Sequence, residues 1–141
     1  MELNESLYVY LTSVAPLTAL TSTRIYTDES RQTNPHTMPY LVYSKVSEFE
    51  VDTVKEQANM LIASSYQFDV WARDRHTARD VAKQVRKAFK GLKGQIGGAT
   101  GVTISAVEKV NAMSDIDRDN KTGEIAFREM LEFQIWHYET D

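Results

Sequence analysis

The spacing of apolar residues predicts two helices and five strands along this chain of 141 residues. Near the start, the apolar residues between Leu7 and Val14 recur at helical intervals, and Asn4 precedes them as a candidate cap. Pro16 cannot continue that helix, although it can begin a further helical turn. The chain therefore opens with helical structure that leads into the first predicted strand.

Alternation of apolar and polar residues predicts strands at residues 24–26, 40–46, 61–72, 101–110 and 124–139. Strict alternation in the fourth strand places Ile104 and Ala106 on one face and Val107 on the other. Trp71, Met130 and Trp136 fall on the strand faces opposite the predicted core, where either a partner or the first helix would cover them.

The main helix is predicted at residues 77–92. Thr77 with Asp80 three residues later is typical of a helix start, and Asp74 is a second candidate cap. The apolar positions recur every three or four residues and form one continuous stripe: Ala78, Val81, Ala82, Val85, Ala88, Phe89 and Leu92. Basic residues occupy most of the remaining surface, so the helix is amphipathic.

Two polar stretches separate the predicted strands. Residues 47–60 are charged without a clear period and indicate a long loop or an extended hairpin arm, and residues 111–122 indicate a polar loop. The order of elements predicts an α+β fold, in which a mostly antiparallel β-sheet carries the long basic helix and the N-terminal helix on one face. The length predicts a single domain, residues 1–141.

The charge is unevenly distributed. The net charge is −4, yet the segment from Arg73 to Lys93 holds eight of the 16 basic residues and only two acidic ones. That segment is therefore +6 and the rest of the chain −10. A basic ridge on an acidic body can steer association with a protein partner, including another copy of the same chain.

The candidate catalytic and metal-binding patterns are weak. The chain has no cysteine, which excludes disulfides and thiolate chemistry and suits a reducing cytoplasm, and its three histidines lack metal-ligand spacing. Asp115, Asp117 and Asp119 match the first ligands of a calcium loop, but Asn120 and Ala126 stand where glycine and glutamate are needed. We therefore expect no catalytic residue, cofactor or metal.

Membrane, export and nucleotide-binding signals are also missing from the pattern. The apolar runs are too short to span a bilayer, and the acidic start MELNES does not fit a signal peptide. The glycines at residues 91–101 follow a helix instead of preceding one, so they do not make a phosphate loop. The basic helix has no interleaved aromatic residues, and the isoelectric point is about 5.4, which argues against nucleic-acid binding.

The strand FDVWARD that runs directly into the helix TARDVAKQVRKAFKGL resembles the tail-completion family of long-tailed bacteriophages and prophages, also called tail terminators or head–tail joining proteins. The segments APLTALTSTRIYTDES, MPYLVYSKV and DIDRDNKTGEIAFREMLEFQIWHYE agree with that resemblance, which covers nearly the whole chain.

The resemblance implies a structural virion protein at the head–tail junction, assembled in the bacterial host cytoplasm. Such proteins form a ring, usually of six copies, that caps the tail tube and provides the docking surface for the head connector, with DNA only passing through. A closed ring needs two different patches on each subunit. The candidate subunit or partner contacts are Trp71, Arg79, Lys83, Arg86, Lys87, Lys90, Asp115, Asp117, Arg118, Asp119, Met130 and Trp136.

Three alternatives remain open at the level of the sequence. One is a head-completion or stopper protein of the same junction. The second is a ligand-binding or enzymatic α+β domain, which requires a titratable group in a cleft. The third is a nucleic-acid-binding module, whose affinity would fall steeply with salt.

Overall fold

The computed structural model of the protein describes residues 2–27, 38–50, 59–118 and 125–140. Its helices are α1 (Leu3–Thr12), α2 (Ala15–Thr21) and α4 (Arg75–Phe89). Its strands are β1 (Ile25–Thr27), β2 (Tyr40–Glu50), β3 (Asn59–Ala72), β4 (Gly94–Gln95), β5 (Thr103–Arg118) and β6 (Ile125–Thr140). The predicted α+β class is confirmed.

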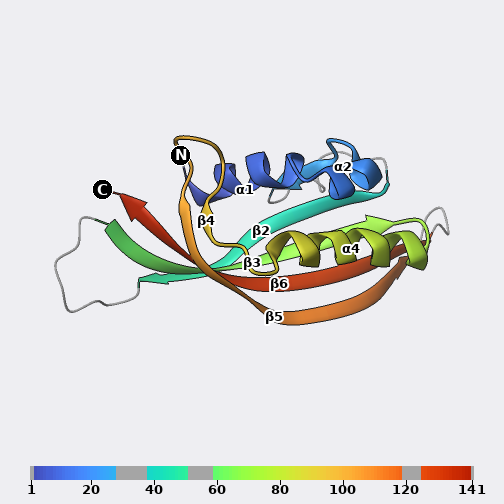
Figure 1. Cartoon of the computed structure of the whole chain (residues 1–141). Coiled ribbons are helices and arrows are strands. Elements are labelled where there is room, and N and C mark those ends of the chain that lie inside the picture. Colours follow the sequence, from blue (N-terminus) through green and yellow to red (C-terminus); the bar gives the residue numbers. More distant parts are fainter. Residues whose placement is uncertain (1, 28–37, 51–58, 119–124, 141) are drawn as a thin grey trace.

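The strands form one sheet in the order β1-β2-β3-β6-β5-β4. All neighbouring strands are antiparallel except β1 and β2, which pair in parallel through three residues. The helices lie on one side of the long, curved strands, with α1 and α2 in one row and α4 beside them (Figure 1). The other face of the sheet is the helix-free face.

The main core lies between the helices and the sheet. Phe68 of β3 is fully buried at its centre, with ring centroids 5.0 Å from Phe89 of α4 and 5.7 Å from Phe133 of β6. Tyr43 and Tyr66 extend this aromatic cluster toward β2. The alternation predicted for β3 and β6 is confirmed, since the residues on their core face, such as Phe68 and Phe133, are buried.

A second, smaller cluster lies on the helix-free face. Trp71 is only 5% exposed and packs with Tyr40 and Val42, and the guanidinium of Arg128 lies 5.5 Å from the Trp71 ring centroid. Trp71 was predicted to be covered either by a partner or by the first helix. It is covered instead by side chains of neighbouring strands, so neither prediction fits. This cluster also explains why β2 is apolar on both faces at its start.

Helix α4 begins at a side-chain cap. The carboxylate of Asp74 accepts hydrogen bonds from the Thr77 amide (2.8 Å) and the Thr77 hydroxyl (2.9 Å), which holds the pKa of Asp74 below its ordinary value. The predicted Thr77–Asp80 start is therefore wrong, and Asp80 instead lies 3.3 Å from His76. Asn4 is not a cap either: it is inside α1 and donates to the Thr27 hydroxyl.

The predicted loop at residues 111–122 is wrong up to Arg118, because β5 continues to that residue by pairing with β6. The side chains of this half of β5 are exposed on both faces, so their polarity does not indicate a loop. Irregularities in the β5–β6 register at Ser105 and Val110 also break the strict alternation, placing Ile104 and Val107 on the same face.

The stretch at residues 47–60 is an extended hairpin arm as far as it is described. Strand β2 continues through Ser47–Glu50 and β3 begins at Asn59, so the extended alternative fits the two described ends of the stretch. Residues 51–58 lie outside the described part.

The short segment between α4 and β5 docks on α1, where the Val102 amide donates to the Ser6 hydroxyl.

Candidate assembly surfaces

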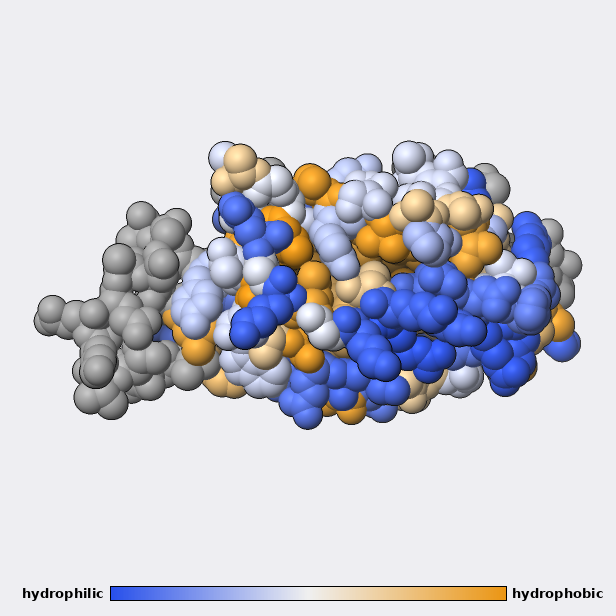
Figure 2. All heavy atoms as spheres, viewed as in Figure 1, coloured by the Kyte–Doolittle hydropathy of each residue, from blue (hydrophilic) through white to orange (hydrophobic). Residues whose placement is uncertain are grey.

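Helix α4 presents a row of basic side chains beside β5. Arg79, Arg86 and Lys90 are spaced at i, i+7 and i+11 and therefore project on one side of the helix, next to its buried apolar stripe. Hydrophilic side chains gather over α4 on this face of the molecule (Figure 2). The basic ridge expected from the sequence is thus a continuous exposed surface.

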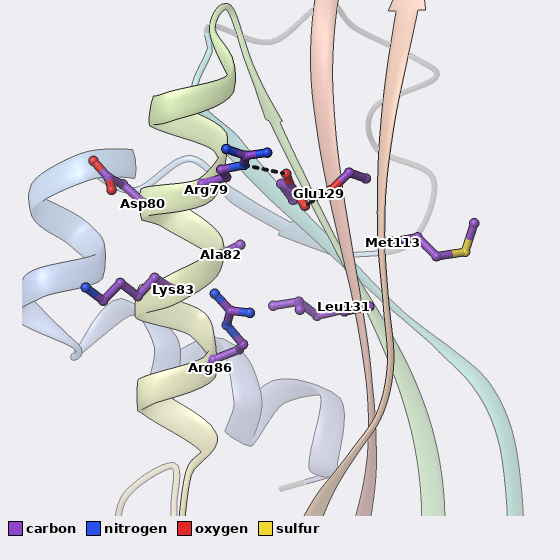
Figure 3. Close-up of a pocket in the computed structure, with 10 residues that line it drawn as sticks. Arg79, Asp80, Ala82, Lys83, Arg86, Met113, Glu129 and Leu131 are labelled. Carbon is purple, nitrogen blue, oxygen red and sulfur yellow. Dashed lines mark hydrogen bonds and ion pairs between the residues drawn. The ribbon is translucent and has the colours of Figure 1, made fainter.

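A groove runs between this basic row and β5. Its two adjoining parts, of about 370 and 300 Å³, share Arg86 as a lining residue. Leu131 and Phe133 of β6 form an apolar floor, together with Ala112 and Val107 of β5. In Figure 3, Arg79 and Arg86 reach from α4 toward the strands, whereas Asp80 and Lys83 point away. The groove suits a segment that carries both apolar and acidic groups.

One acidic group already lies at the end of this groove. Glu129 is 3.9 Å from the guanidinium of Arg79 and accepts a 2.7 Å hydrogen bond from the Ser114 hydroxyl. No such carboxylate is recorded within ion-pair distance of Arg86 or Lys90 among the described residues. Those two cations are exposed to solvent at the second part of the groove.

The outer strands of the sheet each have a long free edge. On β2, the pairing with β1 covers only Leu41–Tyr43, and on β5 the pairing with β4 covers only Thr103 and Ile104. Within the residues that the structure describes, no strand pairs with the outer edge of β2 from Ser44 to Glu50 or with that of β5 from Ser105 to Arg118. Unpaired backbone groups of this kind are templates for adding another strand.

Large apolar side chains are exposed on both of these strands. Val46 and Phe49 of β2, and Val110, Met113 and Ile116 of β5, are each more than half exposed. Soluble monomers seldom expose apolar groups along unpaired strand edges, and such edges usually mark an interaction surface. These five residues were not among the predicted contacts, although each stands as an apolar residue beside polar ones in the sequence.

The helix-free face of the sheet is acidic. The register places Glu108, Asp115 and Asp117 of β5, and Glu132 of β6, on this face. Asp69 is also here, but Arg128 pairs with it at 2.7 Å. The two faces of the sheet therefore carry opposite charge: basic on the helix side and acidic on the other.

The predicted contact residues are distributed over these surfaces. Arg79, Lys83, Arg86, Lys87 and Lys90 are exposed on α4, and Asp115, Asp117 and Arg118 are exposed on β5 instead of on a loop. Met130 and Trp136 are half-buried on the helix-free face. Asp119 lies outside the described residues.

A buried polar pair lies at the other end of the sheet. His137 is fully buried and its Nε2 is 2.9 Å from the Ser64 hydroxyl, while its Nδ1 has no hydrogen-bond partner among the described residues. Burial lowers the pKa of His137 to about 4, with Glu48 acting to raise it and Lys45 to lower it. The imidazole is therefore neutral at neutral pH.

The described residues contain no group of three or more histidine, aspartate or glutamate side chains that could hold a metal ion. Asp115 and Asp117, the first two positions of the calcium-loop spacing, lie on an extended strand, and Asp119 and Asn120 lie outside the described residues. None of the described helices is long and apolar enough to cross a membrane.

Comparison with known families identifies the class of protein to which this chain belongs. The family described as "Tail completion protein gp17" matches residues 5–138, so the chain belongs to that family of phage tail structural proteins. Among curated proteins, none matches the chain.

A solved structure with the same fold is a chain of the "Virion of native gene transfer agent (GTA) particle". It has a TM-score of 0.62 and 18% sequence identity, and the match covers 94% of this chain and 92% of that one. A second solved structure matches with a TM-score of 0.44 and 12% identity over 96% of each chain.

Proposed function

We propose that this protein caps the tail tube of a phage or phage-like particle as a ring, usually of six copies, and provides the surface on which the head connector docks. The whole chain acts as one domain in this role, without an enzymatic activity, and its partners are further copies of itself, the tail-tube protein and connector proteins. Membership of the tail completion family carries the proposal.

The opposite charge of the two sheet faces supports an orientation for the subunit. A lumen lined by α4 would hold DNA through its phosphates and impede its movement. A lumen lined by Glu108, Asp115, Asp117 and Glu132 repels DNA and lets it pass. The acidic helix-free face therefore faces the lumen, and the basic ridge faces protein on the outside.

Growth of the tail tube tests the capping role. The purified protein is added to polymerising tail-tube protein from the same phage or prophage, and tube lengths are measured by electron microscopy. A cap that binds one end stops growth there, so the mean length should fall as the protein is added. Tubes of unchanged length that carry no protein at their ends would contradict the proposal.

Delivery of DNA tests the orientation. Replacing Asp115 and Asp117 by lysine reverses charge on the helix-free face, and we expect assembled particles in normal number that deliver DNA less efficiently. The control is Asp80→Lys, the same change on the helix side, which should leave delivery unchanged. Equal delivery by both variants would place the helix-free face away from the lumen.

A further inference from the structure

We propose that the free edge of β5 from Asn111 to Arg118, the docking edge, binds an extended segment of another virion protein as an added strand. The two faces of β5 set the chemistry of that segment. It carries acidic and apolar side chains toward the groove beside α4, and basic side chains toward the helix-free face. This inference rests on the proposed function for the source of the segment, and it names the surface that receives it.

The backbone of the docking edge is prepared for a further strand. This part of β5 pairs with β6 without a register shift, so it is regular. The amide of Ala112 donates to Oδ1 of Asn111 (2.9 Å), and the amide of Ile116 donates to Oδ1 of Asp115 (2.8 Å). Alternate residues of a strand present their amides at the same edge, and these local side-chain acceptors can give way to the carbonyls of an added strand. Ala112, Ser114 and Ile116 therefore offer outward donors.

The helix side of an added strand would meet positive charge that has no partner. Ala112 lines the first part of the groove together with Arg86, which reaches from α4 toward the strands (Figure 3). Among the described residues, no carboxylate is recorded within ion-pair distance of Arg86, whereas Arg79 already has Glu129 at 3.9 Å. Adjacent strands lie about 4.8 Å apart, so a glutamate placed beside the small Ala112 extends toward Arg86.

The remaining side chains of the docking edge specify the rest of the segment. Ile116 is more than half exposed on the same side as Ala112, so an apolar side chain beside it would remove it from water. On the helix-free face, Asp115 and Asp117 are exposed, and Met113 is more than half exposed. Basic side chains suit the two aspartates and an apolar one suits the methionine. Because the two faces differ in charge, the segment can bind only one way round.

A second copy of this chain does not fit the docking edge. Two copies joined edge to edge by antiparallel β5 strands have their helices on the same side, so the two basic rows on α4 would face each other and repel. The edge of β2 is blocked in a copy standing level with the first. Its Leu41 would face Ser114 of β5, and β1 already covers β2 at Leu41–Tyr43. The occupant is therefore a segment of a different protein.

Hydrogen–deuterium exchange with mass spectrometry locates the added strand. Exchange over the docking edge is compared in the free protein, in the self-assembled protein and in purified particles. We expect protection of this stretch only in the particles, where the partner is present. Equal exchange in all samples would overturn the inference. Protection that is already complete in the self-assembled protein would assign the edge to a second copy and would overturn it as well.

A synthetic peptide of about eight residues, within the usual length of a strand, tests the chemistry. Glu and Val occupy its odd positions, and Lys and Thr its even positions. The protein should bind this peptide in fluorescence anisotropy, and Ala112→Pro should abolish the binding, because proline removes an outward amide that β6 does not use. The control is Ala112→Ser, which retains the amide. Equal binding of a scrambled peptide, or by Ala112→Pro with its fold intact by circular dichroism, would contradict the added strand.

A charge exchange tests the groove. Arg86→Glu should weaken binding of the peptide about tenfold, since it replaces an attraction by a repulsion, and a peptide with Lys in place of Glu should recover most of the loss. Lys87→Glu is the matched control, because it makes the same kind of change on α4 outside both parts of the groove. Equal losses in the two variants would contradict the contact with Arg86. Binding of duplex DNA in place of the peptide would assign the groove to nucleic acid and overturn the inference.

The capping of tail tubes separates this inference from the proposed function. A protein that binds the peptide at the docking edge but does not cap tubes keeps the inferred edge and rejects the proposed function. A protein that caps tubes while its docking edge stays unprotected in particles keeps the proposed function and rejects the edge.

Discussion

The buried His137 makes the stability of this protein depend on pH in a calculable way. Its pKa is about 4 in the folded protein, against an ordinary value of 6.5, because burial removes the imidazolium from water. Between these values the unfolded chain binds a proton at this residue and the folded protein does not. Stability is therefore fully present above pH 6.5 and is lost as the pH falls toward 4.

The size of the effect follows from the two pKa values. One pKa unit corresponds to about 1.4 kcal/mol, so the free energy of unfolding should fall by about 2 kcal/mol between pH 7.5 and pH 5 through this residue alone. That is a large share of the roughly 5–15 kcal/mol by which domains are stable. The His137 side chain is fully buried, so solvent screening reduces this free-energy change only a little.

The variant His137→Gln removes the titration and retains an amide that can bond the Ser64 hydroxyl. Urea unfolding at one protein concentration, at pH 7.5 and pH 5, should show the wild-type protein losing about 2 kcal/mol more than the variant. His76→Gln is the control, because the His76 side chain is exposed. Parallel losses in the wild-type protein and His137→Gln would refute the assignment of the low pKa.

Three further changes test the fold. Phe68→Ala should cost about 3–5 kcal/mol of unfolding free energy in urea titration, since it empties the centre of the aromatic core. Gly97→Ala should be less stable than Gly98→Ala in the same assay: both glycines have positive φ, but only a Cβ at Gly97 meets α1, 2.8 Å from Ser6. Asp74→Ala should speed amide exchange in the first turn of α4, and the wild-type cap should weaken as the pH falls below the ordinary carboxylate range.

The elements that face the core could be predicted from the sequence. β3 and β6 alternate cleanly because each has one face against the helices and the other more polar, and α4 has one buried stripe. These patterns are local consequences of burial. They were sufficient to place the main helix, strands β3 and β6, and the packing of the helices on one face of the sheet.

The assembly surfaces could not be predicted in the same way. The second half of β5 is exposed on both faces, so the pairing with β6 that makes it a strand leaves no periodic signal in the sequence. Val46 and Phe49 of β2, and Val110 and Ile116 of β5, are isolated apolar residues in the sequence. Their alignment across the sheet depends on register, which only the folded structure contains.

Electron cryomicroscopy of tail tubes incubated with the purified protein tests the central claim most directly. We expect a closed ring of six copies at one end of each tube, with α4 on its outer side and the helix-free face of the sheet around the lumen. Protein bound along the tube wall, or tubes whose two ends remain bare, would contradict it.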